Sequence, residues 1–196
     1  MPGCLPNAAS RIDPRARILP PHTPSATSML HAATFATPLG DMFALASAQG
    51  LCLLAFTDQA HLARAQAQVQ QARGPVHSGG HEVLAQVEQQ LQAYFAGQRR
   101  HFDVPLDGVG TAFQQRVWQA LQRIPWGQTC SYAQQAVYLG QPRAVRAVAQ
   151  AHGQNKIAIL VPCHRVIGSQ GQLTGYAGGL ARKQYLLALE AGQTTV

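Results

Sequence analysis

Long hydrophobic runs are absent from this sequence of 196 residues, and charged residues are few. The longest apolar stretches, such as residues 51–56 and 157–161, fall far short of the roughly 20 residues that a transmembrane helix needs. The first 28 residues lack the apolar centre of a signal peptide. With 46% hydrophobic and 12% charged residues, the composition also excludes wholesale disorder. We therefore expect a soluble, cytoplasmic protein without a membrane partner, long enough for one full domain or two small ones.

Cysteine is scarce as well. The four thiols, Cys4, Cys52, Cys130 and Cys163, are widely spaced and include no Cys-x-x-Cys pair. This spacing, without a secretory context, predicts reduced thiols rather than a disulfide framework. A zinc site would have to gather Cys and His ligands from distant parts of the chain, so we expect no metal and no cofactor. One of the reduced thiols is then available for chemistry.

Acidic residues are nearly absent from the C-terminal part of the chain. Positive and negative side chains balance within residues 1–107, so the whole formal charge of +7 lies in residues 108–196. Glu190 is the only carboxylate side chain in that segment. A segment this basic is typical of a polyanion-binding domain, although a charge that only serves solubility has the same signature.

Proline and glycine divide the chain into an extension and two domains. Residues 1–28 hold half of the twelve prolines and few apolar residues, which indicates a disordered extension. Residues 29–107 are expected to form an N-terminal α/β domain. Its predicted elements are strands over residues 33–40, 41–48 and 51–57, helices over 59–72 and 83–95, and an extended linker over 101–110.

Residues 108–196 form the second predicted domain, which is mainly helical. Two capping-box patterns predict helix starts, Thr111 with Gln114 and Ser131 with Gln134. Gly140 ends the second helix, and Pro142 opens a third that runs to about residue 152. Two short helices joined in this way are typical of a helix-turn-helix, although many helical hairpins bind nothing. A strand over residues 157–161, a glycine-rich loop and a helix that ends at Glu190 complete an α+β fold.

Cys163 follows the predicted strand and a proline. Because Pro162 cannot donate to a sheet, the strand should end there and present the thiol at a sheet edge or pocket mouth. An inert buried cysteine is the simpler interpretation, but the adjacent His164 and Arg165 favour a reactive thiol, since positive charge stabilises a thiolate. A Cys–His pair needs a third group to orient the imidazole, and Glu190 is the available carboxylate. Neighbouring residues in extended chain point in opposite directions, so we expect His164 to reach Cys163 through a water molecule.

These residues carry a resemblance to a known family. The sequence Ile-Leu-Val-Pro-Cys-His-Arg-Val around Cys163 resembles the active-site motif of the O6-alkylguanine-DNA alkyltransferases, also called methylated-DNA–protein-cysteine methyltransferases. The similarity covers most of residues 30–190. It includes Ala-Tyr-Phe-Ala-Gly at 93–97, Gly110-Thr111 with Phe113 and Val117-Trp118, Ile-Pro-Trp-Gly at 124–127, Ser131-Tyr132, Arg-Ala-Val at 146–148, Asn155, Gly-Tyr-Ala-Gly-Gly-Leu at 175–180 and Leu-Leu-Ala-Leu-Glu at 186–190.

The resemblance implies a role for each matching position. Cys163 would accept the alkyl group, activated through water by His164, which Glu190 orients. Asn155 would link the recognition helix to the active-site turn. The remaining implied roles are a proton donor and nucleotide-rotating residue (Tyr132), a pocket for the flipped guanine (Val166, Tyr176, Ala177), and DNA contacts (Arg146, Tyr132, Arg143, Ser169), with Arg146 filling the gap in the base stack.

Two positions depart from the family pattern. Lys156 stands where proline commonly follows the asparagine, and Ala177 lacks a hydroxyl that some relatives carry.

The recognition helix has small residues at Ala144, Ala147 and Ala151, which we expect on one face. Small side chains permit close approach to a narrow groove, so we follow the family in expecting minor-groove binding.

The resemblance therefore implies direct-reversal DNA repair on an α+β fold whose N-terminal domain is ribonuclease-H-like. A monomer would flip O6-alkylguanine, or O4-alkylthymine, out of duplex DNA and transfer the alkyl group irreversibly to Cys163 in a single turnover. Three alternatives remain open. They are a regulatory protein that binds alkylated DNA without turnover, a cysteine hydrolase that uses the same Cys–His–Glu trio, and a thiol-based transcriptional sensor.

Overall fold

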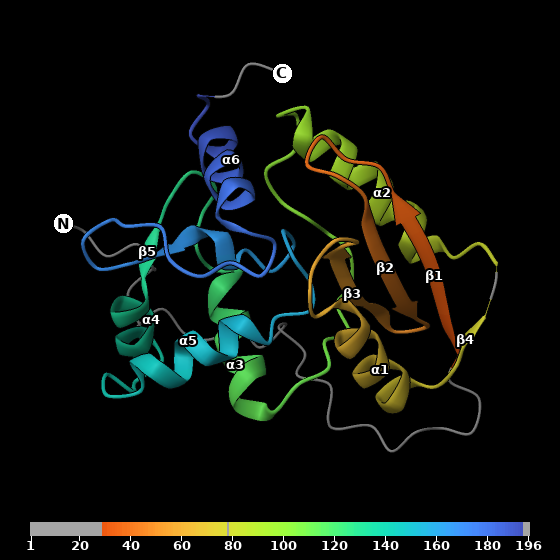
Figure 1. The fold of residues 1–196 in the computed structure, drawn as a ribbon, viewed down its shortest axis with the longest axis horizontal. Coiled ribbons are helices and arrows are strands. Elements are labelled where there is room, and N and C mark those ends of the chain that lie inside the picture. The colour runs from red at the N-terminus through yellow and green to blue at the C-terminus, as the bar shows by residue number, and fades with distance from the viewer. Residues whose placement is uncertain (1–28, 78, 194–196) are drawn as a thin grey trace.

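The computed structural model of the chain describes residues 29–77 and 79–193. The predicted disordered extension, residues 1–28, lies outside the described residues. A sheet-bearing half and a helical half lie side by side (Figure 1). This arrangement confirms the α+β class expected from the sequence. None of the helices in the described part of the chain is both long and apolar enough to cross a bilayer.

A four-stranded sheet organises the first half. Its strands are β1 (Leu30–Phe35), β2 (Met42–Ser47), β3 (Gly50–Phe56) and β4 (Val76–His77). The order is β3-β2-β1-β4, in which β1–β2 and β2–β3 are antiparallel and β4 is parallel to β1. The meander of three strands agrees with the sequence pattern, whereas nothing in that pattern indicates the two-residue β4.

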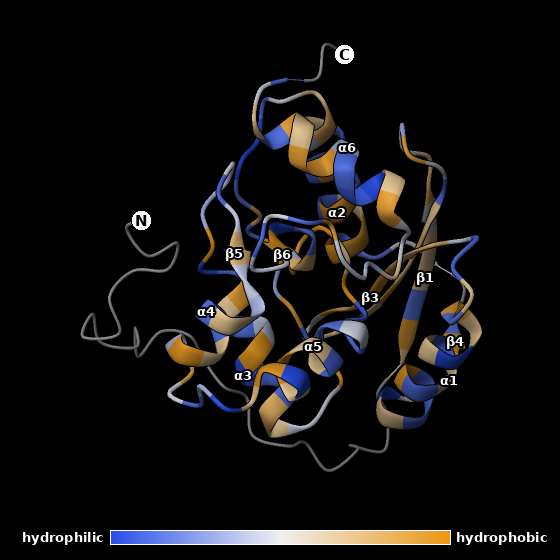
Figure 2. Cartoon of the chain, turned by 60° about the vertical axis from the view of Figure 1, so that its left-hand side comes forward, coloured by the Kyte–Doolittle hydropathy of each residue, from blue (hydrophilic) through white to orange (hydrophobic). Residues whose placement is uncertain are grey.

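Two helices cover the sheet, α1 (Leu62–Arg73) and α2 (Glu82–Phe95). Strand β3 is buried along its whole length because both of its faces are covered. Leu54 packs in one cluster with Leu91 of α2, and Leu53 packs in another with Val69 of α1. Helix α2 buries Leu84, Val87 and Leu91, and the visible part of this helix contains hydrophobic residues (Figure 2, orange).

The second half is built from short helices and one small sheet. Its elements are α3 (Ala112–Leu121), β5 (Cys130–Ser131), α4 (Tyr132–Tyr138), α5 (Val145–Gly153), a 3₁₀ turn (Cys163–Arg165), β6 (Val166–Ile167) and α6 (Leu180–Glu190). Both predicted capping boxes are present, because the Thr111 and Ser131 side chains and their glutamine partners each accept a backbone N–H. Helices α4 and α5 pack against each other and against α3, as a helix-turn-helix requires.

The start of the recognition helix differs from the sequence prediction. Helix α5 begins at Val145, three residues after the expected Pro142. The backbone N–H of Ala144 donates to the carbonyl of Gln141 at 2.9 Å, so Pro142 and Arg143 form the centre of a turn. A proline fixes its own φ at a value that suits this turn position as well as the first residue of a helix, which explains the error.

The predicted strand over residues 157–161 is wrong. This segment is a tight turn that contacts the edge of β3. The Leu54 N–H donates to the Lys156 carbonyl and the Ala158 N–H donates to the Leu54 carbonyl, each at 2.8 Å. Ile159 has a positive φ of 68°, which no strand tolerates. The run is apolar because Ile157, Ile159 and the residues that follow are buried between the two halves, and only Ile157 makes a β-bridge to the sheet.

One hydrophobic core continues across both halves. The predicted linker is extended, and it docks alongside β3, where the Leu51 N–H donates to the Pro105 carbonyl at 2.8 Å. Asp107 at its end accepts a two-point ion pair from Arg73 of α1 at 2.7 Å per contact. The cluster that contains the sheet residue Phe56 and α2 also contains Trp118 of α3 and Leu186 of α6. Residues from both halves of the chain therefore pack in one cluster.

Candidate active site and DNA-binding face

Cys163 lies at the start of the 3₁₀ turn that follows Pro162, and its side chain is half-buried. Asn155, just after α5, donates from Nδ2 to the Cys163 Sγ at 3.3 Å and to the Val161 carbonyl at 2.9 Å. Its Oδ1 accepts the Ile157 N–H at 3.0 Å, so the whole amide is fixed. Burial raises the pKa of the Cys163 thiol, while the Asn155 hydrogen bond and the charge of Lys183 lower it. The thiol is therefore protonated at rest, with a donor already in place for the thiolate.

Lys156, which stands where the family commonly has proline, fixes the position of the segment that carries Asn155. Its Nζ donates to the Val109 carbonyl at 3.2 Å and lies 5.9 Å from the centre of the Trp118 ring. These contacts tie the residue after Asn155 to the docked linker and to α3. A side-chain tether stands here in place of the rigid ring of a proline.

His164 and Glu190 form a buried pair beside Cys163. The His164 Nε2 lies 2.9 Å from the Glu190 Oε1, and neither side chain is exposed. Burial lowers the pKa of His164 against the opposing effect of Glu190, so the imidazole is neutral at rest. A carboxylate only accepts hydrogen bonds, so Nε2 carries the proton and Nδ1 holds the lone pair. Within the described residues Nδ1 is buried without a hydrogen-bond partner, as a general base for the neighbouring thiol requires.

Glu190 is held by more donors than the histidine alone. Arg165 donates from Nε to Oε2 at 2.8 Å and from Nη2 to Oε1 at 2.9 Å, and the hydroxyl of Tyr94 donates to Oε1 at 2.8 Å. Although burial raises the pKa of Glu190, hydrogen bonds and charge from His164 and Arg165 lower it to about 2. The expectation that the charge of Arg165 favours a thiolate at Cys163 is wrong. The Arg165 guanidinium is paired with the Glu190 carboxylate instead.

A glycine brings the chain close to Glu190. Gly127 has a φ of 72°, and its N–H lies 3.4 Å from the Glu190 Oε2. A Cβ at this position would lie 2.9 Å from the backbone carbonyl oxygen of Glu190, closer than side-chain carbons approach. The turn before β5 therefore needs glycine both for its backbone angle and for this contact.

The three residues expected to form the base pocket lie along β6 and the glycine-rich loop. Val166 is fully buried in β6, Tyr176 is half-buried, and Ala177 is exposed. The Tyr176 ring stands edge-on to the His164 ring with centroids 6.4 Å apart. Burial and the nearby Cys163 raise the pKa of Tyr176 and also that of Tyr132, so both phenols remain protonated near the thiol.

A buried lysine joins the two parts of this pocket. Lys183 of α6 is fully buried, and its Nζ donates to the carbonyls of Val166 and Thr174, each at 2.6 Å. The side chain thus fixes β6 relative to the loop that carries Tyr176. Helical spacing could have revealed it, since Lys183, Leu186 and Glu190 fall on one inward face of α6.

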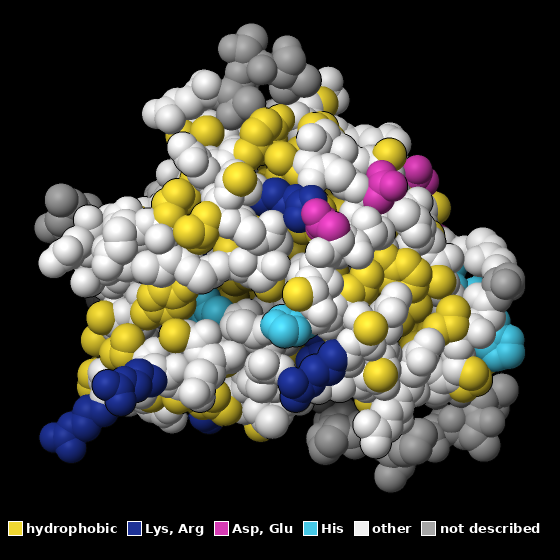
Figure 3. All heavy atoms as spheres, in the orientation of Figure 1, with side chains coloured by type: hydrophobic (Ala, Val, Ile, Leu, Met, Phe, Trp, Pro, Cys, Tyr) yellow, Lys and Arg dark blue, Asp and Glu magenta, His cyan; other side chains and the backbone are white. Residues whose placement is uncertain are grey.

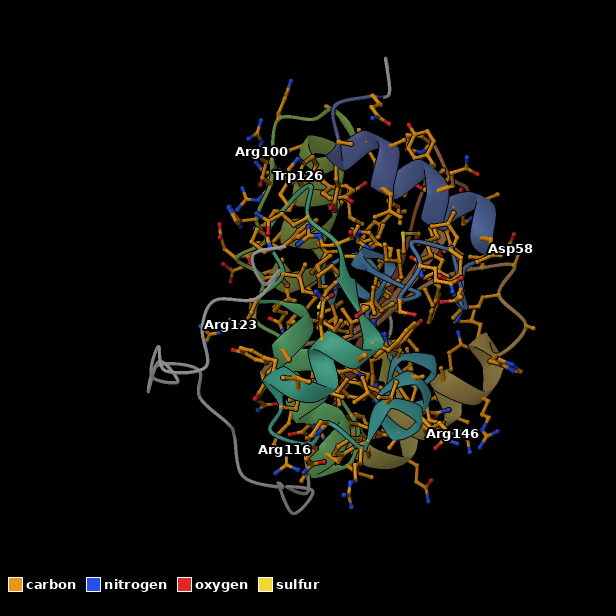
Figure 4. All side chains as sticks on the ribbon, turned by 90° about the vertical axis from the view of Figure 1, so that its left-hand side faces the viewer. Asp58, Arg100, Arg116, Arg123, Trp126 and Arg146 are labelled. Carbon is orange, nitrogen blue, oxygen red and sulfur yellow. The ribbon has the colours of Figure 1, made fainter. Side chains whose placement is uncertain are left out.

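Three of the four side chains expected to contact DNA are exposed, and the fourth, Tyr132, is half-buried near Cys163. Arg146 is exposed on α5, Arg143 is exposed in the turn before it, and Ser169 is exposed beyond β6. Figure 4 places Arg146 at the outer end of the molecule, away from Arg123 and Arg100. On the face drawn in Figure 3, the visible acidic side chains lie over the upper right, and basic side chains protrude over the α4–α5 side.

The small-residue face of α5 is shorter than expected. Ala147 is exposed, whereas Ala151 is buried and its carbonyl accepts the Trp118 Nε1 hydrogen at 2.9 Å. Ala151 faces the core because α3 packs against this part of α5. An open groove of about 550 Å³ lies between the beginning of α3 and the exposed side of α5. The exposed residues of α5 are Arg146, Ala147, Ala149, Gln150 and Gly153.

Comparisons with known proteins show the family to which the chain belongs. Two protein-family models match the chain. Residues 30–108 match the family described as 6-O-methylguanine DNA methyltransferase, ribonuclease-like domain. Residues 112–192 match the family described as 6-O-methylguanine DNA methyltransferase, DNA binding domain. A methylated-DNA–protein-cysteine methyltransferase of Mycolicibacterium paratuberculosis is 55% identical over 125 residues, which are 62% of this chain and 76% of that protein. The chain belongs to this family.

Solved structures of the methyltransferase family have the same fold. The crystal structure of Mycobacterium tuberculosis O6-methylguanine methyltransferase matches with a TM-score of 0.72 and 42% identity, covering 85% of this chain and 96% of that one. The M. tuberculosis protein in complex with DNA matches with a TM-score of 0.71 and 41% identity, covering 84% of this chain and 94% of that one.

In this methyltransferase-family chain the structure brings four of the expected site residues together as two hydrogen-bonded pairs, Asn155 with Cys163 and His164 with Glu190, which are joined through the backbone of the 3₁₀ turn. Tyr132 and Tyr176 lie near Cys163, whereas the other three expected DNA contacts, Arg143, Arg146 and Ser169, are exposed on the surface. Sequence reasoning missed Tyr94 and Lys183, and it assigned Arg165 to another partner. Within the described residues, no cluster of three or more His, Cys, Asp or Glu side chains has a geometry that could hold a metal ion.

Proposed function

We propose that this protein repairs O6-alkylguanine in double-stranded DNA by transferring the alkyl group to Cys163, once per protein molecule. The observation that carries the proposal is a thiol held by Asn155 and, on the adjacent residue, an imidazole paired with a buried carboxylate, on a methyltransferase-family fold. Asn155 holds the sulfur at 3.3 Å, and His164 pairs with Glu190 at 2.9 Å. The exposed α5 beside this group supports duplex DNA as the partner.

The proposed chemistry follows from the protonation states. His164 takes the proton of Cys163 on Nδ1 through a water molecule, and Glu190 stabilises the resulting imidazolium. The thiolate attacks the alkyl carbon in line, a C–S bond forms, and the bond from that carbon to guanine O6 breaks. The electron pair stays with the guanine, which takes a proton from the Tyr132 phenol, and the phenolate then receives the proton that His164 took from Cys163. The product thioether has no carbonyl for water to attack, so the protein is not regenerated.

Access to the lesion requires the nucleotide to leave the duplex. Flipping a base costs a few kcal/mol, and less for a lesion that pairs poorly, which gives some selectivity. We propose that Arg146 enters the gap in the stack and that phosphate contacts, including Arg143 and Ser169, supply affinity independent of sequence. Val166, Tyr176 and Ala177 would then border the flipped guanine.

The chain organisation fits this proposal. We propose that residues 29–107 and 108–196 act as two domains of a monomer, the second of which binds DNA and accepts the alkyl group. Among the described residues, Cys52 and Cys163 are free thiols, which suits the reducing cytoplasm. Cys163 itself argues against a protein that only binds alkylated DNA, and the named relatives argue against a hydrolase.

The decisive experiment uses duplex DNA that carries O6-methylguanine labelled on the methyl group. We expect the label to move to the protein, to reach one equivalent and to be found on a Cys163 peptide. Cys163→Ala should take up none, and Cys52→Ala, which removes a buried thiol, should behave like the wild type. Release of labelled methanol or continued turnover would contradict the proposal and favour a hydrolase.

A further inference from the structure

Tyr94 is the one residue of the sheet-bearing half whose side chain donates a hydrogen bond, among those the structure describes, to the proposed catalytic group. It lies in the last turn of α2, and its hydroxyl donates to the Glu190 Oε1 at 2.8 Å. The side chain is 0% exposed. Its ring packs against Phe95, Phe102 and Trp126, with ring centroids 5.2–5.4 Å apart. The hydroxyl is therefore held on Glu190 by rigid packing.

The direction of this hydrogen bond is fixed. Burial and the Glu190 charge raise the pKa of Tyr94 well above its usual value, so the phenol keeps its proton. The ionised Glu190 can only accept. Tyr94 is thus an obligatory donor to the same oxygen that accepts the Nε2 hydrogen of His164 at 2.9 Å and an Nη2 hydrogen of Arg165 at 2.9 Å.

Three donors on one oxygen compete for its charge. A carboxylate oxygen that already accepts a short hydrogen bond attracts a further positive donor less strongly. The Tyr94 hydroxyl also restricts rotation of the carboxylate, because it fixes Oε1 while Arg165 fixes Oε2 at 2.8 Å. Both effects act on the bond between Glu190 and His164, although Tyr94 makes no described contact with His164 or Cys163.

We propose that Tyr94 is a positioning residue that sets the strength of the Glu190–His164 pair and thereby the supply of thiolate at Cys163. This inference rests on the proposed function. Other charged or titratable groups that face the pair are Arg165, Lys183, Tyr176 and Cys163 itself. None of these is altered by removing the Tyr94 hydroxyl, so Tyr94→Phe isolates its contribution.

The experiment measures single-turnover methyl transfer from O6-methylguanine duplex DNA between pH 6 and pH 8.5. Without the Tyr94 hydroxyl, Glu190 holds the imidazolium form of His164 more strongly, so less neutral base is present at acid pH. We expect the ratio of wild-type to Tyr94→Phe rate to be at least about threefold larger at pH 6 than at pH 8.5. A residue that only fills space would lower the rate by one factor at every pH.

Two further variants separate the explanations. Phe95→Leu weakens the same core but keeps the hydroxyl, so its rate ratio should not change with pH. In a Glu190→Gln background, Tyr94→Phe should lose its pH-dependent effect, because the group through which Tyr94 acts has been removed. Persistence of the effect in that background, or a pH-independent ratio for Tyr94→Phe, would overturn the proposal.

Folding is checked by a cooperative melt of each variant. If Tyr94→Phe does not fold, Tyr94→Met, which also fills the core without a hydroxyl, takes its place. Failure of both to fold would assign Tyr94 a structural role and overturn the inference. Absence of any methyl transfer by the wild type would instead contradict the proposed function, so the two failures are distinguishable.

Discussion

The Nε2 of His152 lies 2.6 Å from the Oε1 of Gln135, and this contact joins α5 to α4. The Gln135 Nε2 donates to the Val117 carbonyl at 3.0 Å, so its Oε1 must be the acceptor and His152 carries its proton on Nε2. His152 is 7% exposed, and its ring stands 5.0 Å from that of Tyr132. Burial and the charge of Lys183 lower the pKa of His152 to about 3.

The first prediction concerns the pH dependence of stability. Below pH 6.5 the unfolded chain protonates this histidine while the folded protein does not, until the pH falls to about 3. Stability is therefore lost as the pH falls through this window, by up to about 1.4 kcal/mol per pH unit from this one group. In His152→Asn, the free energy of unfolding should vary less steeply between pH 6 and pH 4.5, by about one proton. Urea titrations of both proteins measure this, and parallel slopes would show that His152 is protonated in the folded state.

The variant Arg146→Ala tests whether Arg146 fills the gap in the base stack. Because the side chain would refill the base stack, its removal should slow methyl transfer from duplex DNA by several-fold, on the order of tenfold, and should affect single-stranded substrate less. Arg123→Ala removes the same charge from a surface that faces elsewhere (Figure 4) and serves as the matched control. A wild-type rate on duplex DNA for Arg146→Ala would exclude this role.

Cys163→Ala separates binding from chemistry. The cationic surface is intact in this variant, so it should bind duplex DNA with an affinity that falls steeply with salt concentration. The slope of log affinity against log salt counts the phosphate contacts, and Arg143→Ala in the same background should reduce it by about one. Fluorescence anisotropy at several salt concentrations provides the measurement. A slope that does not change would remove Arg143 from the DNA contacts.

Glu190→Gln should change the rate and not the stoichiometry. Loss of the carboxylate weakens general-base assistance by His164, which is typically worth about 10²–10⁴-fold. Intact-protein mass measurement over a single-turnover time course should show one added methyl in both proteins, with the variant reaching it far later. Arg165 loses its buried counter-ion in this variant, so we also expect a lower melting temperature, and rates are compared well below it. A variant as fast as the wild type would show that Glu190 does not assist His164 in activating Cys163.

Local patterns predicted the elements whose causes are local. The capping boxes at Thr111 and Ser131, the inward face of α2 and the meander β1–β3 follow from residue spacing, and the structure confirms each of them. The expected pair of His164 and Glu190 came from counting, because the second half of the chain offers a single carboxylate. The family resemblance supplied the other expected roles.

The remaining features depend on contacts between distant segments. Residues 157–161 have the composition of a strand, but they turn at Ile159 and make a single β-bridge to β3, more than 100 positions earlier in the chain. In the sequence, Tyr94 has the pattern of an ordinary core aromatic residue of α2. Its hydrogen bond to Glu190 forms only because the two halves of the chain pack together. Arg165 adjoins the thiol in sequence, yet the 3₁₀ turn directs its guanidinium to the carboxylate behind. Spacing within one segment cannot reveal such partners.

The turn at residues 157–161 and the docked linker also affect how the protein behaves at high concentration. An exposed edge strand offers unpaired backbone groups to other chains and promotes aggregation through intermolecular sheet formation. On the outer edge of β3, the N–H and carbonyl of Leu51 are bonded to Pro105 and Asp107, and those of Leu54 are bonded to Lys156 and Ala158. The opposite edge of the sheet, among the described residues, is the two-residue β4. The segments that support the active-site cysteine therefore also protect the sheet from self-association.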